Sequence, residues 1–311
     1  MSLQSQPVFF LTFDRGYLIP AATAIFSLLK NHQGQKLKIY LLVSGSDHNW
    51  IQPLVKLIDD SGSTSQIKTV TDELFRNLKF NLQFTEATYY RVMAGELFQE
   101  SKIIYLDSDT LVNGSLNELW DMDLGEYPLA AVEDPLILDY PRLDLLPEHG
   151  YFNSGVMVLN LDRWREMGLG KQVLSFIKNF PEKIQYADQC GLNAILKGNW
   201  KRLAPKWNLQ TAFLEKESLE NCKNAFSDLE LSTASTDPRI IHYTGRIKPW
   251  NLGSRHPKKS LFWNYLAQTP FKRRLPLDFS FLNLIKSIFP LSIKKYYWRY
   301  LKRKQNQLAL S

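Results

Sequence analysis

The chain has few cysteines and no long apolar run, and each scarcity excludes a class of protein. Its two cysteines, Cys190 and Cys222, lie far apart and form no Cys-x-x-Cys pair. This usage fits reduced thiols in a cytosolic protein better than a disulfide framework. No run approaches the ~18 apolar residues that a membrane span needs. The N-terminus has no basic segment followed by an apolar signal core, so secretion is not indicated.

Glycine-rich nucleotide loops are also missing. The chain contains neither a Gly-x-Gly-x-x-Gly segment nor a Walker loop, which argues against a dinucleotide dehydrogenase or a P-loop enzyme. We find no internal repeat and no low-complexity tract. With 311 residues and 44% apolar content, the chain can bury a sizeable core, as one large α/β domain or two ordinary ones.

Positive charge is concentrated at the C-terminus. The net charge is +7, but the segment from Lys272 onward holds ten Lys and Arg against one acid, a net of +9. The preceding 271 residues therefore carry 28 bases and 30 acids, a net of −2. An enzyme acting on nucleic acid normally has a basic face on its folded body. This distribution therefore disfavours a nucleic-acid partner.

Short apolar runs alternate with segments of helical periodicity. The expected strands are Val8–Phe13, Leu37–Val43, Ile67–Val70, Lys102–Leu106, Leu129–Val132, Val156–Asn160 and Ile240–His242. The expected helices are Pro20–Asn31, a helix from the cap Asp47 to Asp60, Thr88–Phe98 and Asp188–Leu196. This order predicts an α/β sheet covered by helices on both faces.

Polar residues stand at the ends of four predicted strands: Asp14, Asp107, Asp134 and His242. Ligands of α/β sheets bind beyond the carboxyl ends of the strands. We therefore expect these side chains to share one site.

Asp107-Ser108-Asp109 is the most informative of these segments. In extended backbone, residues i and i+2 point the same way, so both carboxylates can face one point. Two adjacent carboxylates repel each other unless a cation or a donor lies between them. Mg²⁺ and Mn²⁺ prefer oxygen ligands of this kind. The alternative is that the two carboxylates only shape a turn, and the motif alone leaves both interpretations open.

Three further blocks follow in order: Tyr151-Phe-Asn-Ser-Gly-Val-Met-Val-Leu-Asn160-Leu-Asp-Arg-Trp164, Tyr186-Ala-Asp-Gln189 and His242-Tyr-Thr-Gly-Arg-Ile-Lys-Pro-Trp250. Together with Asp107-Ser-Asp109, they closely resemble the metal-dependent retaining sugar transferases of glycosyltransferase family 8. Bacterial members include lipooligosaccharide galactosyl- and glucosyltransferases. The resemblance implies a GT-A fold, with one Rossmann-like domain whose acceptor side is built from loops and later segments.

The resemblance implies that Asp107, Asp109 and His242 bind Mn²⁺ or Mg²⁺. Without the motif, His242 would be an ordinary strand-end histidine bonded to backbone. The resemblance also implies that Gly245 and Lys248 contact the diphosphate of the donor. Glycine permits close backbone approach, and lysine supplies a point charge.

For the nucleotide, the resemblance implies that Asp14 and Tyr17 contact uracil. The family's frequent asparagine between them is Gly16 here. Arg91 matches a donor-binding arginine, with a helix-surface ion pair as the alternative. Ser108 lies between the two acidic ligands, and we expect it to contact the donor as well.

For the donor sugar, Asp134, Asn153, Asp188 and Gln189 match positions that hold its hydroxyls. Asp188 could instead be, or also be, a helix N-cap. The resemblance implies retention of configuration, with Asp188 and Gln189 as the catalytic pair near the anomeric carbon. Because a neutral amide is a poor nucleophile, we favour front-face substitution, in which the leaving-group oxygen takes the acceptor's proton. The residue after Gln189 is Cys190, where some relatives have aspartate. The sugar selectivity of those relatives therefore cannot be assigned to this chain.

Two segments complete the expectations. The loop from Pro135 to Gly150 resembles one that covers the donor and forms the acceptor site, and a plain surface loop is the alternative. In the tail, residues 293–304 would form a helix with an apolar aromatic face and basic residues elsewhere, which suits an anionic membrane surface. A helix packed on the domain is the alternative there. We divide the chain into a GT-A domain, residues 1–271, and a basic amphipathic tail, residues 272–311.

The sequence thus predicts a Mn²⁺- or Mg²⁺-dependent retaining hexosyltransferase, using UDP-galactose or UDP-glucose and a glycan or glycolipid acceptor of the bacterial envelope. Its expected place is the cytoplasm, peripheral on the inner face of the membrane. One alternative is a nucleotidyltransferase that uses the paired carboxylates. The other is a non-catalytic membrane-binding protein with a degenerate site.

Overall fold

A seven-stranded sheet forms the centre of the computed structural model, which describes residues 6–70, 87–273, 275–281 and 283–284. Its strand order is β3-β2-β1-β4-β7-β6-β8. The strands are β1 (Val8–Thr12), β2 (Lys38–Ser44), β3 (Thr64–Val70), β4 (Lys102–Leu106), β6 (Leu129–Glu133), β7 (Phe152–Asn160) and β8 (Lys201–Arg202).

Six of these strands run in one direction. β1 pairs in parallel with β2 and β4, β2 with β3, and β6 with β8. β7 runs antiparallel to both of its neighbours, β4 and β6. The carboxyl ends of β1, β4 and β6 therefore lie at one edge of the sheet, and β7 begins at that edge.

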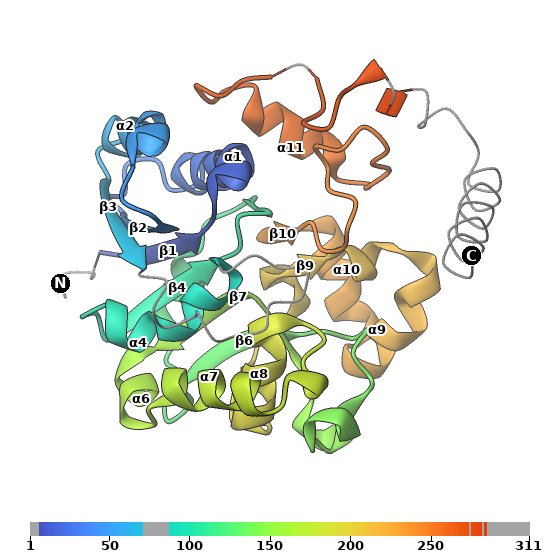
Figure 1. Cartoon of the computed structure of the whole chain (residues 1–311). Helices are drawn as coiled ribbons and strands as arrows, with labels where there is room; N and C mark the ends of the chain where they lie inside the picture. The colour runs from blue at the N-terminus through green and yellow to red at the C-terminus, as the bar shows by residue number, and fades with distance from the viewer. Residues whose placement is uncertain (1–5, 71–86, 274, 282, 285–311) are drawn as a thin grey trace, which may run out of the picture.

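Helices cover both faces of the sheet. Its central strands are apolar on both sides, so each face must be shielded from water. Figure 1 shows α1 and α2 on one face and α4, α6, α7 and α8 on the other. These helices are α1 (Leu18–Lys30), α2 (Gln52–Asp59), α4 (Ala94–Leu97), α6 (Leu161–Glu166), α7 (Leu169–Asn179) and α8 (Ala187–Leu196). The predicted sheet with helices on both faces is confirmed.

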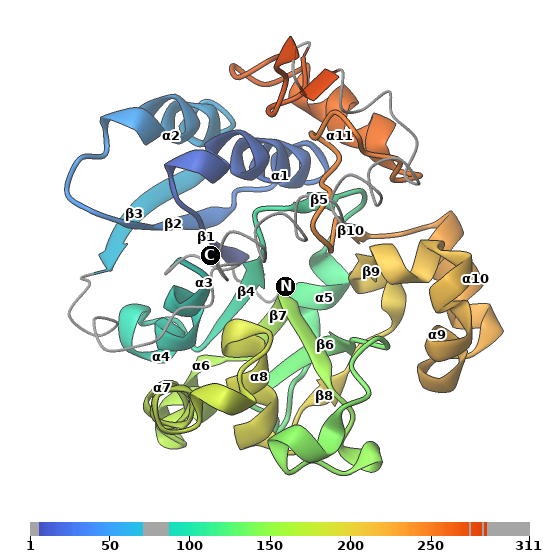
Figure 2. The same ribbon diagram turned by 45° about the vertical axis from the view of Figure 1, so that its right-hand side comes forward.

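A second, three-stranded sheet lies beside the first, in the order β5-β10-β9. Its strands are β5 (Thr110–Val112), β9 (Leu209–Gln210) and β10 (Ile240–His242). The remaining α-helices are α3 (Ala87–Tyr90), α5 (Asn117–Asp121), α9 (Leu219–Ala225), α10 (Asp228–Thr236) and α11 (Lys259–Leu266). In Figure 2, α9 and α10 lie beyond this small sheet, and α11 lies next to α1.

The structure corrects several sequence expectations. The strand predicted over Ile240–His242 is present with those bounds as β10, but it belongs to the small sheet and not to the main one. The single helix expected over Thr88–Phe98 is two short α-helices joined by a 3₁₀ turn, η4 (Arg91–Met93). The expected strand Val156–Asn160 starts four residues earlier, at Phe152. The short strands β5, β8 and β9 were not predicted.

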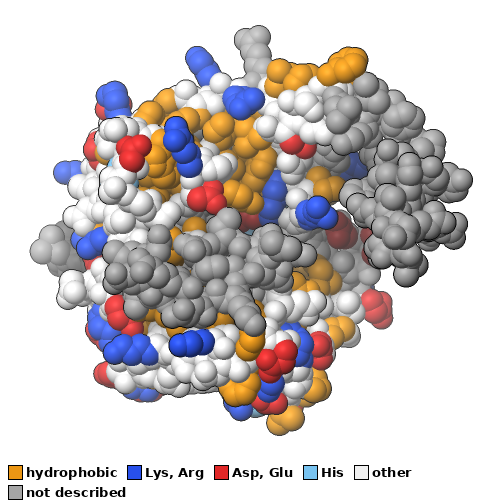
Figure 3. Space-filling view, in the orientation of Figure 1, with side chains coloured by type: hydrophobic (Ala, Val, Ile, Leu, Met, Phe, Trp, Pro, Cys, Tyr) orange, Lys and Arg blue, Asp and Glu red, His pale blue; other side chains and the backbone are white. Residues whose placement is uncertain are grey.

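The start of the tail packs against the main body. The backbone N–H of Leu277 donates to the carbonyl of Trp250 at 3.0 Å, and Asp278 accepts from the N–H of Leu252 at 2.8 Å. The helix expected over residues 293–304 lies outside the described residues. Within the described part of the chain, no helix is both long and apolar enough to cross a membrane. Basic and acidic side chains are interspersed on the face of the molecule seen in Figure 3.

Candidate active site

The Asp107–Asp109 segment forms the turn between β4 and β5. Thr110 closes this turn: its N–H and its hydroxyl both donate to the carbonyl of Asp107, at 3.1 and 2.7 Å. The two carboxylates face other side chains instead. The alternative that they only shape the turn is therefore wrong.

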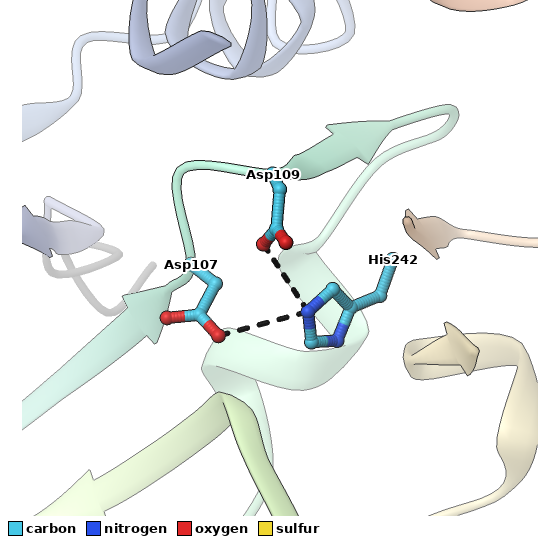
Figure 4. A group of neighbouring side chains, drawn as sticks. All are labelled: Asp107, Asp109 and His242. Atoms are coloured by element: carbon cyan, nitrogen blue, oxygen red, sulfur yellow. Dashed lines mark ion pairs between the residues drawn. The ribbon is translucent and has the colours of Figure 1, made fainter. Parts of the chain in front are cut away.

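His242 reaches these carboxylates through strand pairing. β10 runs antiparallel to β5, and its register places His242 opposite Thr110, the residue after Asp109. The imidazole Nε2 lies 3.2 Å from Oδ1 of Asp109 and 3.6 Å from Oδ2 of Asp107 (Figure 4). The ring is buried, and its Nδ1 lies 3.0 Å from Oδ1 of Asn208. The ring thus bonds to side chains, so the alternative of a histidine bonded to backbone is wrong.

The other oxygen of each carboxylate already has a protein partner. Oδ1 of Asp107 accepts from Nη1 of Arg91 at 2.7 Å and from the hydroxyl of Tyr105. Oδ2 of Asp109 pairs with Nζ of Lys248 at 2.5 Å. Burial alone would raise the pKa of Asp109, but Lys248 and His242 outweigh it and hold that pKa well below its usual range.

One ligand atom from each of Asp107, Asp109 and His242 lies within 4.8 Å of the other two. Two are carboxylate oxygens, and the third is an imidazole nitrogen that accepts unless it is protonated. Carboxylate oxygens suit Mg²⁺ and Mn²⁺, and imidazole is a ligand for transition metals. The residues present therefore fit a divalent cation, and the imidazole favours Mn²⁺ over Mg²⁺.

Gly155 makes this approach possible. It lies in β7 next to the turn, and its carbonyl accepts from the N–H of Asp107 at 2.7 Å. A Cβ at this position would lie 2.1 Å from Cε1 of His242 and 2.7 Å from Oδ2 of Asp107. Any side chain here would therefore displace a candidate ligand.

Arg91 and Asp188 form a buried ion pair beside the turn. The guanidinium donates to both oxygens of Asp188, from Nε at 2.5 Å and from Nη2 at 2.8 Å. Burial alone would lower the pKa of Arg91, but the charges of Asp107 and Asp188 outweigh it and raise that pKa well above its usual value. Arg91 is 4% exposed, so the helix-surface alternative is wrong.

Asp188 has no exposed surface, and both of its oxygens accept from Arg91. α8 begins at Ala187, with Tyr186 in the N-cap position and no side-chain cap bond. The alternative that Asp188 is the N-cap is therefore wrong. Direct contact of Asp188 with a sugar hydroxyl stays a prediction.

Asp134, Asn153 and Gln189 form a second polar group at the same edge. Oδ2 of Asp134 lies 3.3 Å from both Nδ2 of Asn153 and Nε2 of Gln189. Oε1 of Gln189 accepts from the N–H of Ser154 at 3.0 Å. Burial raises the pKa of Asp134, although hydrogen bonds oppose this rise. The structure thus brings together three of the four residues predicted to hold the sugar, while the carboxylate of Asp188 pairs with Arg91 instead.

The predicted nucleotide contacts lie near the start of α1. Asp14 caps the 3₁₀ turn η1 (Arg15–Tyr17) by accepting from the N–H of Tyr17 at 3.1 Å. Tyr17 is 38% exposed, and its ring meets that of Trp250 edge-on at 5.9 Å. The Ser108 hydroxyl donates to the carbonyl of Thr12 at 2.9 Å, which ties the acidic turn to β1.

Lys248 and Gly245 lie in the loop after β10. Lys248 donates to the carbonyl of Tyr243 at 2.8 Å in addition to its pairing with Asp109. Gly245 has a φ of 87°, which only glycine adopts without strain. A Cβ at Gly245 would meet nothing within 4 Å, so the backbone there is open to a ligand.

The loop of residues 135–150 has a small apolar core of its own. Ile137, Leu143 and Leu145 are buried against Cys190 and other residues. Arg142 ties the loop down by donating to the carbonyl of Lys183 and by lying 3.7 Å from Sγ of Cys190. The loop is therefore held against α8, and its role in acceptor binding stays a prediction.

Sequence reasoning missed two supporting residues, Asn208 and Tyr105, and assigned no role to a third, Gly155. Gly155 lies inside the quoted Tyr151–Trp164 block, where a glycine within an apolar strand could have signalled a close approach. Asn208 and Tyr105 carried no such signal.

The model of the family described as glycosyl transferase family 8 matches residues 8–252. General stress protein A of Bacillus subtilis is 30% identical over 263 residues, covering 82% of this chain and 91% of that protein. The lipopolysaccharide 1,2-glucosyltransferase of Escherichia coli K12 is 26% identical over 271 residues, covering 85% and 79%. The solved structure of the galactosyltransferase LgtC in complex with donor and acceptor sugar analogues has a TM-score of 0.75 at 24% identity, covering 85% and 96%. This last likeness confirms the predicted GT-A fold.

Proposed function

The chain belongs to glycosyl transferase family 8, and we propose that it transfers a hexose from a UDP-sugar to a glycan or glycolipid acceptor with the help of Mn²⁺ or Mg²⁺. Membership confirms the resemblance seen in the four sequence blocks. It makes the chain a glycosyltransferase, which argues against the nucleotidyltransferase and the non-catalytic alternatives. The hexose and an envelope acceptor are supported by the lipopolysaccharide glucosyltransferase among its relatives.

The convergence of Asp107, Asp109 and His242 carries this proposal. A cation held by these ligands would offset the negative charge that builds on the diphosphate as it leaves. Lys248 and the backbone at Gly245 would bind the phosphate oxygens. Asp14 and Tyr17 would hold the uracil, next to Ser108.

The group of Asp134, Asn153 and Gln189 would hold the sugar hydroxyls, and Arg91 and Asp188 would fix its surroundings. The carbonyl oxygen of Gln189 accepts from Ser154, and its amide nitrogen faces Asp134. An amide held in this way is a weak nucleophile. We therefore favour front-face substitution with retention, in which the leaving oxygen takes the acceptor's proton.

The test is a donor screen scored by UDP release, using UDP-galactose and UDP-glucose with Mn²⁺ and with Mg²⁺. Asp107→Asn and Asp109→Asn keep the shape of each side chain and remove its charge. We expect both to abolish transfer and hydrolysis while remaining folded. Asp162→Asn is the matched control, since Asp162 is an exposed partner of Arg165 on α6. Full turnover by either site variant, or by the wild-type chain in excess chelator, would refute the metal-dependent function.

We also propose that the tail holds the enzyme on the cytoplasmic face of an anionic membrane. The tail has a net charge of +9, and its described start exposes Leu275, Phe279 and Phe281 by 49, 42 and 76%. Each base near such a surface contributes about 1 kcal/mol, less at high salt. Ten bases, only partly engaged, suffice for reversible attachment.

The contacts of Leu277 and Asp278 decide where the tail should be cut. A chain ending at residue 271 would lose both hydrogen bonds to the loop that carries Trp250. A chain ending at Leu284 keeps them. It should still release UDP, and it should sediment far less with anionic liposomes, because seven of the ten bases of the tail lie beyond residue 284. If the full chain ignores such liposomes at low salt, the membrane role is wrong.

A further inference from the structure

Asn208 holds the nitrogen of His242 that faces away from the two carboxylates. It follows η8 (Pro205–Trp207), and its own N–H donates to the carbonyl of Pro205 at 3.1 Å. Its side chain is fully buried between two partners. Oδ1 lies 3.0 Å from Nδ1 of His242, and Nδ2 lies 3.0 Å from Oδ1 of Asn153.

The backbone N–H of Gly155 is linked to Asn208 through Asn153, and it determines which of these atoms carry protons. The N–H of Gly155 can only donate, so the atom of Asn153 that lies 3.0 Å from it must be the amide oxygen. That oxygen also faces the side chain of Asn208, which must therefore present its NH₂ group there.

The remaining atom of the Asn208 amide is then the carbonyl oxygen, and it faces His242. Because this oxygen can only accept, Nδ1 of His242 must carry the proton. In the neutral ring, Nε2 is then bare, and Nε2 is the nitrogen that lies near Asp107 and Asp109.

We propose that Asn208 is a positioning residue that fixes His242 in its Nδ1–H tautomer and so presents Nε2 to the cation site. Histidines that ligate metals commonly donate their second N–H to such a partner, and its loss typically weakens metal binding 10- to 100-fold. The proposal deepens the proposed function and rests on it for the identity of the cation. The tautomer itself requires no metal.

Asn208 also links the cation site to the sugar site. Through Asn153 it is joined to Asp134, and through Asp134 to Gln189. A change at Asn208 should therefore affect both groups, whereas a change at a remote asparagine should affect neither.

The first test reads the tautomer by ¹⁵N NMR of the imidazole nitrogens in the metal-free chain. The chain has five histidines, and the signals of His242 are assigned by their loss in His242→Gln. We expect a proton on Nδ1 in the wild-type chain. Asn208→Leu removes the acceptor and should release this preference. Asn208→Asp loses the NH₂ group that faces Asn153 but keeps an acceptor for Nδ1, so it should retain the proton there.

The second test measures Mn²⁺ binding by the electron paramagnetic resonance of the free ion. Asn208→Leu should bind Mn²⁺ about 10- to 100-fold more weakly than the wild-type chain. Asn31→Leu is the matched control. Asn31 is likewise tied down through its side chain, but its Nδ2 lies within hydrogen-bond distance of Ser27, Val112 and Tyr265. This control should bind Mn²⁺ as the wild-type chain does, even if it unfolds more easily.

Two results would overturn the proposal: a wild-type His242 protonated on Nε2 and bare at Nδ1, or a folded Asn208→Leu with unchanged Mn²⁺ affinity. The first result is read from the wild-type chain. The proposal can therefore still be refuted if Asn208→Leu does not fold. If the wild-type chain shows the Nδ1–H tautomer but binds no Mn²⁺, the proposed metal site is wrong. The assignment of Asn208 to the tautomer of His242 would then be supported on its own.

Discussion

Gly155→Ala should disable cation binding although it replaces none of the candidate ligands. The added methyl would lie 2.1 Å from Cε1 of His242 and 2.7 Å from Oδ2 of Asp107. β7 cannot easily move to relieve this overlap, because it is paired with β4 on one side and β6 on the other. The imidazole and the carboxylate must therefore move instead.

The size of that movement sets the expected loss. Ordinary van der Waals contact begins near 3.4 Å, so the ring must retreat by about 1.3 Å from the 2.1 Å position. Metal–ligand distances tolerate only about 0.2 Å. His242 would thus cease to be a ligand, and Mn²⁺ affinity should fall by at least the 10- to 100-fold that weaker, indirect changes cause. Crowding of this kind also costs about 1–3 kcal/mol of folding free energy.

Isothermal titration calorimetry with Mn²⁺ measures the loss, and urea unfolding measures the cost in stability. Gly170→Ala is the control: its Cβ would lie 2.8 Å from the carbonyl of Val92, so it is crowded too, but in α7 and by other neighbours. We expect the control to lose stability and keep Mn²⁺ affinity. If Gly155→Ala binds Mn²⁺ as tightly as the wild-type chain, the assignment of His242 as a ligand is refuted.

Three further outcomes are expected. Lys248→Ala should slow transfer about 10- to 100-fold, as the loss of one charge-assisted contact of ~1.5–3 kcal/mol implies; an unchanged steady-state rate would exclude a phosphate contact. Asp188→Asn should cost about 1–3 kcal/mol in urea unfolding, because Arg91 loses one of its two charged partners and keeps only Asp107; an unchanged stability would contradict this. His32 should make stability fall as the pH drops below its ordinary pKa of 6.5, because burial lowers its pKa in the folded chain and the unfolded chain takes up the proton first. Its Nε2 already accepts from the N–H of Leu116, and His32→Gln should flatten the slope of urea midpoints between about pH 7.5 and 5.

The elements that could be predicted from the sequence are those with a strong local pattern. β1, β2 and β4 are continuous apolar runs, and α1 has a clear stripe and a proline in its first turn. β5, β9 and β10 are two or three residues long, too short for a local pattern to specify their pairing. Yet the pairing of β10 with β5 is what carries His242 to Asp109, so the path by which His242 reaches the site could not be predicted.

The candidate site divides in the same way. Asp107, Asp109 and Lys248 bear charge, and charged residues in a recognisable motif are informative from the sequence alone. Gly155 and Asn208 are ordinary residue types, and their roles depend on where the atoms of His242 lie.

The contrast between these two groups has a physical basis. A charged side chain is costly to bury without a partner. A charged residue in an apolar stretch of sequence therefore indicates a binding site. A glycine or an asparagine has no such cost and is used throughout a protein for turns and caps. Gly155 matters because a Cβ would lie 2.1 Å from an atom in another strand. Asn208 matters because its oxygen meets a ring 34 residues further along the chain. Neither fact has a counterpart in the local sequence, so a site of this kind can be recognised from its ligands, while the residues that hold the ligands in place emerge only from the folded structure.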